Sequence, residues 1–309
     1  MSEDKGDTSI SLIDAGKSIA AVIDSVRGGI WTLFEPKAIV RKATAEGQAL
    51  LIKAEAEVGV ESLRRRASQR FEEQRLRYQA NLEAITDHAS SHAIRLLDEG
   101  RMARAQTITS PDPDWTEEWV TNAERIHDPD VQELWGKILA EQIAQPNSFS
   151  KRTLALLRLL NKDEALLFQK FCSYCVVDPT ERDALPVFLW PPTLLERLGD
   201  EALNDMDIEE LASIGLILSN DASMKQDSMP RRFHYFTHTV EISDVRDHGR
   251  LPIRIFSTVG QELRRVCEIF PIERFETHLV DALKAARTTA SIVDPPDPRA
   301  NRVFRGNRL

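Results

Sequence analysis

The sequence predicts a mostly α-helical protein with a long extended helix, a compact helical domain and a C-terminal winged-helix-like α+β unit. Residues 37 to about 105 contain no proline and are rich in Ala, Glu, Arg and Leu. Helix-start signals then recur over residues 109–179, and alternating strand patterns appear only after residue 180. We therefore expect five segments: an N-terminal amphipathic helix (1–36), a long oligomerisation helix (37–108), a compact helical domain (109–179), the winged-helix-like domain (180–288) and a disordered basic tail (289–309).

Composition narrows the class of protein. The chain has 309 residues, 42% of them hydrophobic, and a net charge of −9, so it can bury a core but is not a general nucleic-acid binder. Its three cysteines are too few for a disulfide framework, which favours a reducing compartment. The acidic N-terminus is unlike a signal peptide, and no run of 18 apolar residues occurs. We expect a cytoplasmic protein without a cofactor or metal.

Residues 8–34 carry the first helical pattern, with apolar side chains at steps of three and four. This amphipathic face docks on another helix in the simplest interpretation. A helix lying in the plane of a membrane surface is the alternative, although few basic residues flank it. The face comprises Leu12, Ile19, Ile23, Val26, Ile30 and Trp31.

The segment 37–108 follows as one very long helix. About 70 residues would extend roughly 105 Å at 1.5 Å per residue, which is far beyond an ordinary core helix. Its apolar seam is thin and lacks a leucine heptad, so a second subunit is expected to cover it. Folding back on the same chain at Gly47 or Gly59 is the competing interpretation. The predicted oligomer seam is Leu63, Phe71, Tyr78, Leu82 and Ile85.

Capping residues organise the compact helical domain. Asp114 with Glu117 and Asn161 with Glu164 have the spacing of capping boxes, and Asp128 precedes a proline at a helix start. Tryptophans and leucines between these signals, including Trp119 and Trp135, are expected to form one core.

Beyond residue 180 the order is helix, helix, strand, loop, strand, helix, which is typical of a winged helix. The expected strands are FHYFTHTVEIS (233–243) and LPIRIFS (251–257), and the preceding segment 178–192 is expected to be irregular. The helix in the recognition position, DIEELASIGLI, carries no Arg or Lys to meet phosphates, so protein contact is favoured over nucleic acid. Candidate contact residues for either partner are Arg231, Arg232, Arg250 and Arg254.

One segment resembles a known family. Residues 134–140 (LWGKILA), Pro146, residues 148–150 (SFS) and residues 152–154 (RTL) are similar to the hallmark segment of the bacterial domain of unknown function 2806 family. The resemblance spans roughly residues 8–285. It implies a bacterial origin and a mostly helical fold, and it supplies no catalytic residues.

No sequence motif points to catalysis, since phosphate-binding loops, a nucleophile elbow and a zincin helix do not occur. Cys172 and Cys175 form a C-x-x-C pair that could bind zinc only with His234 and His238. Two buried thiols on a core helix are the simpler interpretation. The pair His88 and His92, four apart on the long helix, is expected on a solvated face.

Together these patterns predict a non-enzymatic interaction or scaffold protein that self-associates through its long helix and binds a protein partner. A defence or stress-response module is a plausible setting. A winged-helix nucleic-acid-associated regulator is the alternative, and a helical assembly attached to a membrane surface is a further one.

Overall fold

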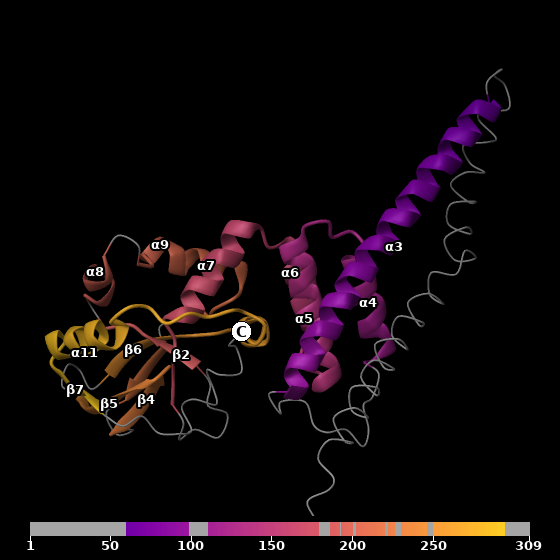
Figure 1. Ribbon diagram of the computed structural model, residues 1–309. Helices are drawn as coiled ribbons and strands as arrows, with labels where there is room; N and C mark the ends of the chain where they lie inside the picture. The colour runs from indigo at the N-terminus through magenta and orange to yellow at the C-terminus, as the bar shows by residue number, and fades with distance from the viewer. Residues whose placement is uncertain are drawn as a thin grey trace, which may run out of the picture. The chain divides into compact units, whose positions relative to one another are not determined.

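The computed structural model forms two compact units, residues 1–154 and 155–309, which are described separately (Figure 1). This division falls inside the segment predicted as one compact helical domain. The residues that the structure describes are 60–98, 111–178, 186–191, 193–199, 202–219, 222–225, 230–245 and 250–293. The predicted N-terminal amphipathic face lies outside them.

The first unit is helical. It contains α3 (Val60–Asp98), α4 (Pro113–Ala123), α5 (Pro129–Ala144) and the start of α6 (Lys151–Leu159). Helix α3 packs mainly on α5 and also on α4. The rings of Trp119 and Trp135 lie 6.2 Å apart between centroids with their planes tilted by 55°, and both are fully buried. The burial of these two tryptophans is as predicted. The single core predicted for residues 109–179 is not, because the division between the units falls inside this range and Phe168 contacts Phe256 in the second unit.

Local capping chemistry sets the starts of these helices. The carboxylate of Asp128 accepts from the backbone of Asp130 and Val131, which confirms the predicted cap of α5. The box predicted at Asp114 is wrong, because Asp112 caps α4 by accepting from Trp115 N at 3.0 Å. A proline at the first helical position follows each cap, and its fixed φ suits that place.

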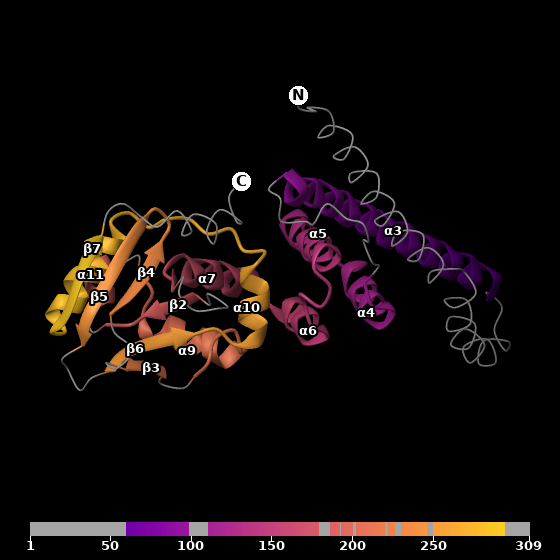
Figure 2. The same cartoon turned by 90° about the horizontal axis from the view of Figure 1, so that it is seen from below.

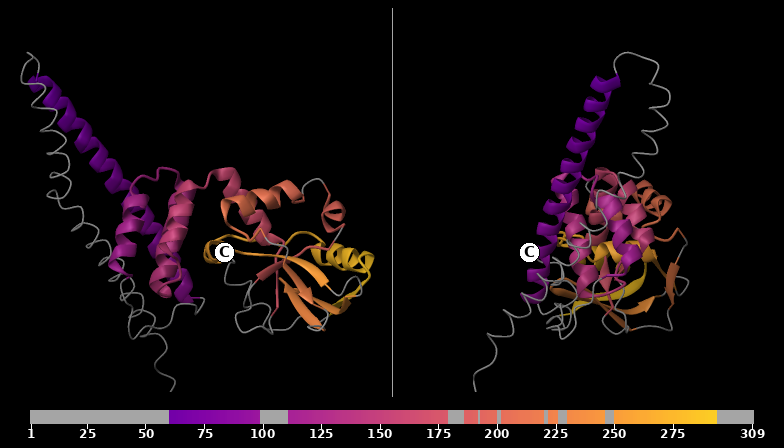
Figure 3. Two further views of the ribbon diagram at one scale, coloured as in Figure 1. Left: turned by 180° about the vertical axis from the view of Figure 1, so that it is seen from behind. Right: turned by 90° about the vertical axis from the view of Figure 1, so that its right-hand side faces the viewer.

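Helix α3 has 39 residues, or about 58 Å at 1.5 Å per residue, and its two halves differ. Figure 3 shows α4 and α5 beside the C-terminal half. Between residues 64 and 77 every side chain is exposed except Phe71. From Leu82 onward one face is buried, including Ile85, Ala89, Ala93 and Leu96.

The predicted oligomer seam must be corrected in this light. Leu82 and Ile85 are 3% and 0% exposed in the core of their own unit, so they offer no surface to a second copy. Phe71 and Tyr78 are half-buried, and the side chain of Leu63 is not among those that the structure describes. Helix α5, from a later part of the same chain, covers the C-terminal part of the seam, and the thin part at residues 64–77 is exposed apart from Phe71.

The second unit combines helices with one antiparallel sheet. The described strands are β1 (Val176–Val177), β2 (Pro186–Leu189), β3 (Ala222–Lys225), β4 (Arg231–Tyr235), β5 (His238–Val245), β6 (Arg250–Ile255) and β7 (Thr288–Val293). They form a seven-stranded sheet in the order β3-β6-β2-β1-β4-β5-β7. Its helices are α7 (Lys162–Ser173), α8 (Leu194–Leu198), α9 (Asp205–Ile214), α10 (Thr258–Arg264) and α11 (Phe275–Ala285). Figures 1 and 2 show α7, α9 and α11 on one side of the sheet.

The winged-helix arrangement is not confirmed. The segment predicted as a single strand, FHYFTHTVEIS, contains the turn of the β4–β5 hairpin, in which Tyr235 pairs with His238. Phe236 makes that turn in the left-handed region at φ 47°, where a bulky residue is uncommon, so no usual turn signal marks it. The predicted irregular segment contains β2, and residues 289–293 of the predicted tail belong to strand β7 (Thr288–Val293). The rest of the predicted tail lies outside the described residues.

Aromatic rings connect the helices to the sheet. Phe171 on α7 meets Phe188 on β2 at 5.6 Å, edge to face. The hydroxyl of Tyr235 donates to Ser173 O at 3.1 Å and accepts from Ile272 N at 2.8 Å. The capping box predicted at Asn161 and Glu164 is confirmed at the start of α7.

Candidate functional site

The predicted arginine contacts on β4 have acidic partners within the chain. Arg231 Nη1 donates to Asp178 Oδ2 at 3.2 Å, and the Asp178 side chain is 6% exposed. Arg232 Nε donates to Glu241 Oε2 at 2.7 Å across the hairpin. These two guanidinium groups are therefore partly neutralised before any external anion arrives.

The arginines on β6 lie apart from those on β4. Between the two strands lie β2 and β1, so three strand spacings, or about 14 Å, separate them. Arg250 is exposed, while the guanidinium carbon of Arg254 lies 4.9 Å from the ring centroid of Trp190. The four predicted residues therefore do not form one basic patch.

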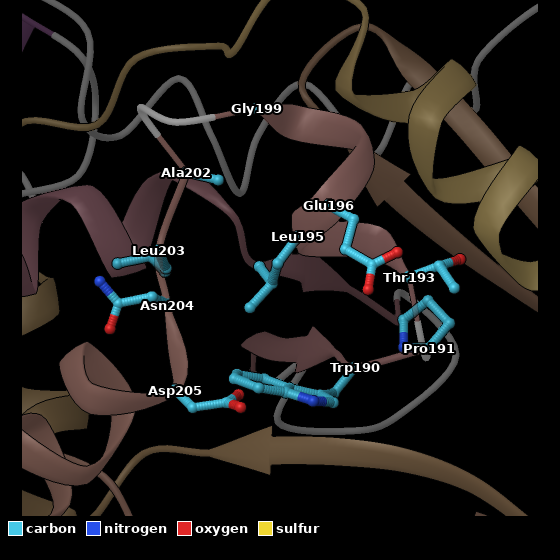
Figure 4. A pocket seen from close by; sticks show the side chains of 10 residues that line it. All are labelled: Trp190, Pro191, Thr193, Leu195, Glu196, Gly199, Ala202, Leu203, Asn204 and Asp205. Atoms are coloured by element: carbon cyan, nitrogen blue, oxygen red, sulfur yellow. The ribbon is translucent and has the colours of Figure 1, made fainter.

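A groove of about 520 Å³ lies beside Trp190 in the second unit, and we call it the Trp190 groove (Figure 4). The end of β2, helix α8 and the start of α9 build it. Its lining is Trp190, Pro191, Thr193, Leu195, Glu196, Gly199, Ala202, Leu203, Asn204 and Asp205.

The position of Trp190 follows from the sheet. Its backbone N donates to Pro252 O at 2.9 Å, and its ring meets Phe188 edge to face at 5.2 Å. In Figure 4 the indole lies flat along one side of the groove, with Leu195 pointing toward it and Asp205 next to one end. The ring is half-buried, so part of it remains available for contact.

Two carboxylates lie in the lining of the groove. Glu196 and Asp205 are exposed there, and the described lining residues include no Lys, Arg or His. Two cations border the groove, since Arg254 faces the Trp190 ring and Lys170 Nζ donates to Ala202 O at 3.3 Å. Asn204 accepts from Asp207 N at 3.0 Å, and Asp207 Oδ2 accepts from Asn204 N at 2.8 Å, forming the capping box of α9. This cap fixes the chain direction at the groove edge, and the groove suits a cationic or aromatic ligand.

Sequence reasoning missed this groove. The segment FLWPP was interpreted as irregular, and its tryptophan was given no role. The available signal was a tryptophan just after a short apolar run, followed by two prolines and two acidic helix starts. Only the fold brings Trp190 and Asp205 together.

A second candidate surface is the exposed part of α3, residues 64–80, which we call the α3 arm. It holds two glutamates, Glu72 and Glu73, and a 54% exposed leucine, Leu76. Arg75 Nη2 donates to Glu72 Oε1 at 2.5 Å. The arm contains an excess of positive charge, since its arginines are Arg64, Arg65, Arg66, Arg70, Arg75 and Arg77.

The cysteines behave as core thiols. Cys172 and Cys175 are buried, and Cys267 is half-buried. Burial raises the pKa of Cys175 to about 12. Burial, with a smaller effect of neighbouring Cys267, also raises the pKa of Cys172 well above its usual range. Among the described residues, no group of three or more His, Cys, Asp or Glu side chains is placed to hold a metal ion.

The histidines are also placed by packing. His234 is buried with Nδ1 2.9 Å from Thr239 Oγ1, so it does not join the cysteines. His88 and His92 were expected on a solvated face, but they lie between helices. His92 Nε2 is 3.5 Å from Glu141 Oε1 on α5, with both side chains largely buried.

No described helix combines the length and the apolar character needed to cross a membrane. The proposed membrane-facing segment, residues 8–34, lies outside the description.

Comparison with known proteins identifies a family for this chain. No curated protein and no solved structure matches the chain. A family model described as a protein of unknown function, DUF2806, matches residues 65–280. That range includes most of the described α3, the LWGKILA segment and the Trp190 groove. The predicted resemblance is therefore confirmed, and the chain belongs to the DUF2806 family.

Proposed function

We propose that this protein is a non-enzymatic interaction protein whose α3 arm binds a protein partner. The supporting observation is the contrast along one helix: the C-terminal half of α3 is buried against α5, while residues 64–77 are exposed apart from Phe71. Nucleating a helix is costly but extending one is not, so the half packed on α5 can propagate the helix into the exposed residues. The anchored half therefore presents the arm as a preformed binding surface.

The arm's chemistry favours an acidic partner. Six arginines against two glutamates give an excess of four positive charges over residues 64–80. The exposed Leu76 and half-buried Phe71 add a small apolar contact, which a protein surface can cover. Arginine forms bidentate pairs with carboxylates, so a carboxylate-rich surface is the best match.

Self-association through the same helix is a narrower proposal. Two of the five predicted seam residues, Leu82 and Ile85, are already buried within the chain. Two arms of equal positive charge also repel each other, and that repulsion is strongest at low salt. An acidic partner of a different sequence fits the arm better.

The test is site-specific photocrosslinking in the full chain. A photoreactive residue at Leu76 should give a crosslinked partner, and the same residue at Ile94 should not. Ile94 is a matched control because it is 55% exposed on the same helix, against 54% for Leu76. Reversing Arg66, Arg70 and Arg77 to Glu should abolish the Leu76 crosslink. Equal crosslinking at both positions, or none at Leu76, would contradict the proposal.

Nucleic-acid binding is the second candidate function. The α3 arm is a better candidate surface for it than the arginines of β4. Arg231 and Arg232 have carboxylate partners, whereas the arm has more arginines than carboxylates. A helix of this kind can lie along phosphates without reading bases. Replacing Arg66, Arg70 and Arg77 by Ala should reduce the slope of log affinity against log salt by about 3 for duplex DNA. Absence of duplex binding at low salt would exclude this candidate.

A further inference from the structure

We propose that the Trp190 groove binds the chain's own arginine-rich C-terminal sequence, residues 294–309. This would be an internal contact of the second unit, independent of the α3 arm. The groove supplies a surface of defined charge, and the sequence that follows β7 supplies the opposite charge.

The groove favours a cation for electrostatic reasons. Glu196 and Asp205 contribute two exposed carboxylates, and the described lining residues include no Lys, Arg or His. Like charges gathered on one edge raise the local concentration of a positively charged segment.

The indole adds selectivity for arginine. Arg254 already places its guanidinium carbon 4.9 Å from the Trp190 ring centroid, so this ring stacks with a guanidinium in the folded protein. Leu195, which is half-buried, lines the same groove and can contact the aliphatic stem of an arginine. A planar guanidinium gains more from this combination than a lysine ammonium.

The C-terminal sequence begins within reach of the groove. The last residue of β7, Val293, pairs with Thr239 on β5. The adjacent residue, His238, has its Nδ1 atom 4.0 Å from Oε1 of Glu276 in the first turn of α11. Helix α11 in turn packs on α8, which lines the groove. Sixteen residues can extend to about 50 Å, which exceeds the length of α11, about 16 Å.

The spacing of the arginines suits an extended ligand. Arg299, Arg302, Arg305 and Arg308 recur every third residue, and no acidic residue follows Asp297. In a polyproline II conformation, which the preceding DPPDP sequence favours when bound, every third side chain lies on the same side. Successive arginines would then be about 9 Å apart, so neighbouring arginines can approach Trp190 with Asp205 and Glu196 in turn.

Calorimetric titration with a synthetic peptide of residues 294–309 tests the proposal. The receptor is the full chain in which Arg299, Arg302, Arg305 and Arg308 are replaced by Gln, so that its own C-terminal sequence does not compete. We expect this receptor to bind the peptide, and the natural chain to bind it about tenfold more weakly because its groove is occupied.

Matched charge variants locate the contact. In the Gln-substituted receptor, Glu196→Gln with Asp205→Asn should weaken peptide binding about tenfold, equivalent to about 1.4 kcal/mol. Glu209→Gln with Glu210→Gln removes the same charge outside the groove lining and should change binding less than twofold. All four side chains are exposed, so circular dichroism should show unchanged folding.

Three results would overturn the proposal. The first is no binding by the Gln-substituted receptor, and the second is equal affinity for the natural chain. The third is an equal loss in both pairs of charge variants, since that would indicate general acidity instead of a site. A peptide with Lys at the four Arg positions should bind more weakly, and equal binding would contradict the role of Trp190.

Discussion

Gly136 on α5 and His88 on α3 lie so close that a β-carbon on residue 136 would be 2.7 Å from the β-carbon of His88. The same added atom would lie 2.8 Å from Ala89 N and from Ile85 O. Two of these three contacts are backbone atoms, which cannot rotate away as a side chain does. The glycine of the LWGKILA segment therefore permits the close crossing that buries the C-terminal half of α3.

Gly136→Ala should destabilise the first unit. Overpacking against a helix backbone costs about 1–3 kcal/mol, which exceeds the gain of about 0.5–1 kcal/mol from replacing a helical glycine. Chemical denaturation followed by tryptophan fluorescence reports this loss, since Trp119 and Trp135 are in the same core. Val131→Ala, at a partly exposed position of α5, should change stability by less than about 0.5 kcal/mol. Similar values for the two variants would argue against the close crossing.

Ile85→Ala and Leu76→Ala should separate the two halves of α3. Ile85 is 0% exposed, so its truncation should lower the free energy of unfolding by about 2–5 kcal/mol. Leu76 is 54% exposed, and its truncation should have an effect below about 0.5 kcal/mol. Denaturant midpoints of the two variants measure the difference. If both variants lost stability equally, and only at high protein concentration, Ile85 would belong to an intermolecular seam after all.

Asn81→Ala should break a buried polar network between α3 and the α4–α5 connection. Asn81 Nδ2 donates to Glu124 O at 2.8 Å, and Asn81 Oδ1 accepts from Gln132 Nε2 at 3.3 Å. Leaving such groups without a partner costs about 1–3 kcal/mol. Gln79→Ala is the control, since its bond to Glu83 is exposed. Thermal unfolding of both variants should show a clear loss only for Asn81→Ala.

Stability should fall at alkaline pH because of the buried thiols. The pKa of Cys175 is about 12 in the folded chain, against 9.0 for an unperturbed thiol, because burial disfavours the thiolate. Above pH 9 the unfolded chain loses this proton while the folded chain keeps it, so ionisation favours unfolding. The contribution of Cys175 is thus complete below pH 9 and is lost as the pH rises toward 12. Urea unfolding between pH 8 and 11 measures this slope.

Cys175→Ala should flatten that dependence, whereas Cys267→Ala, at a half-buried position, should change it less. A thiol reagent at pH 8 gives an independent check. The native chain should react first at Cys267, and Cys172 and Cys175 should react only after denaturant is added. Rapid labelling of Cys175 in the native chain would contradict its burial.

Local signals in the sequence were sufficient for several features. Asp128 and Asn161 were predicted as caps because a cap depends on hydrogen bonds that span only three residues. The burial of Trp119 and Trp135 was predicted from the size and spacing of their side chains. The family resemblance also rested on a contiguous segment, which a family model now matches.

Contacts between distant segments decided the rest. Helical periodicity marked Leu82 and Ile85 as apolar, yet only the packing of α5 showed that the same chain covers them. The β4–β5 hairpin turns at Phe236, whose residue type gives no turn signal. Strand β2 pairs with β6 across 64 to 68 residues, from Leu189–Ile253 to Val187–Ile255. The Trp190 groove likewise depends on the end of β2 meeting two later helices, α8 and α9. Short-range hydrogen bonds depend on neighbouring residues and can be predicted from the sequence. Strand pairing and burial depend on which distant surfaces exclude water together, and this is seen only in the folded chain.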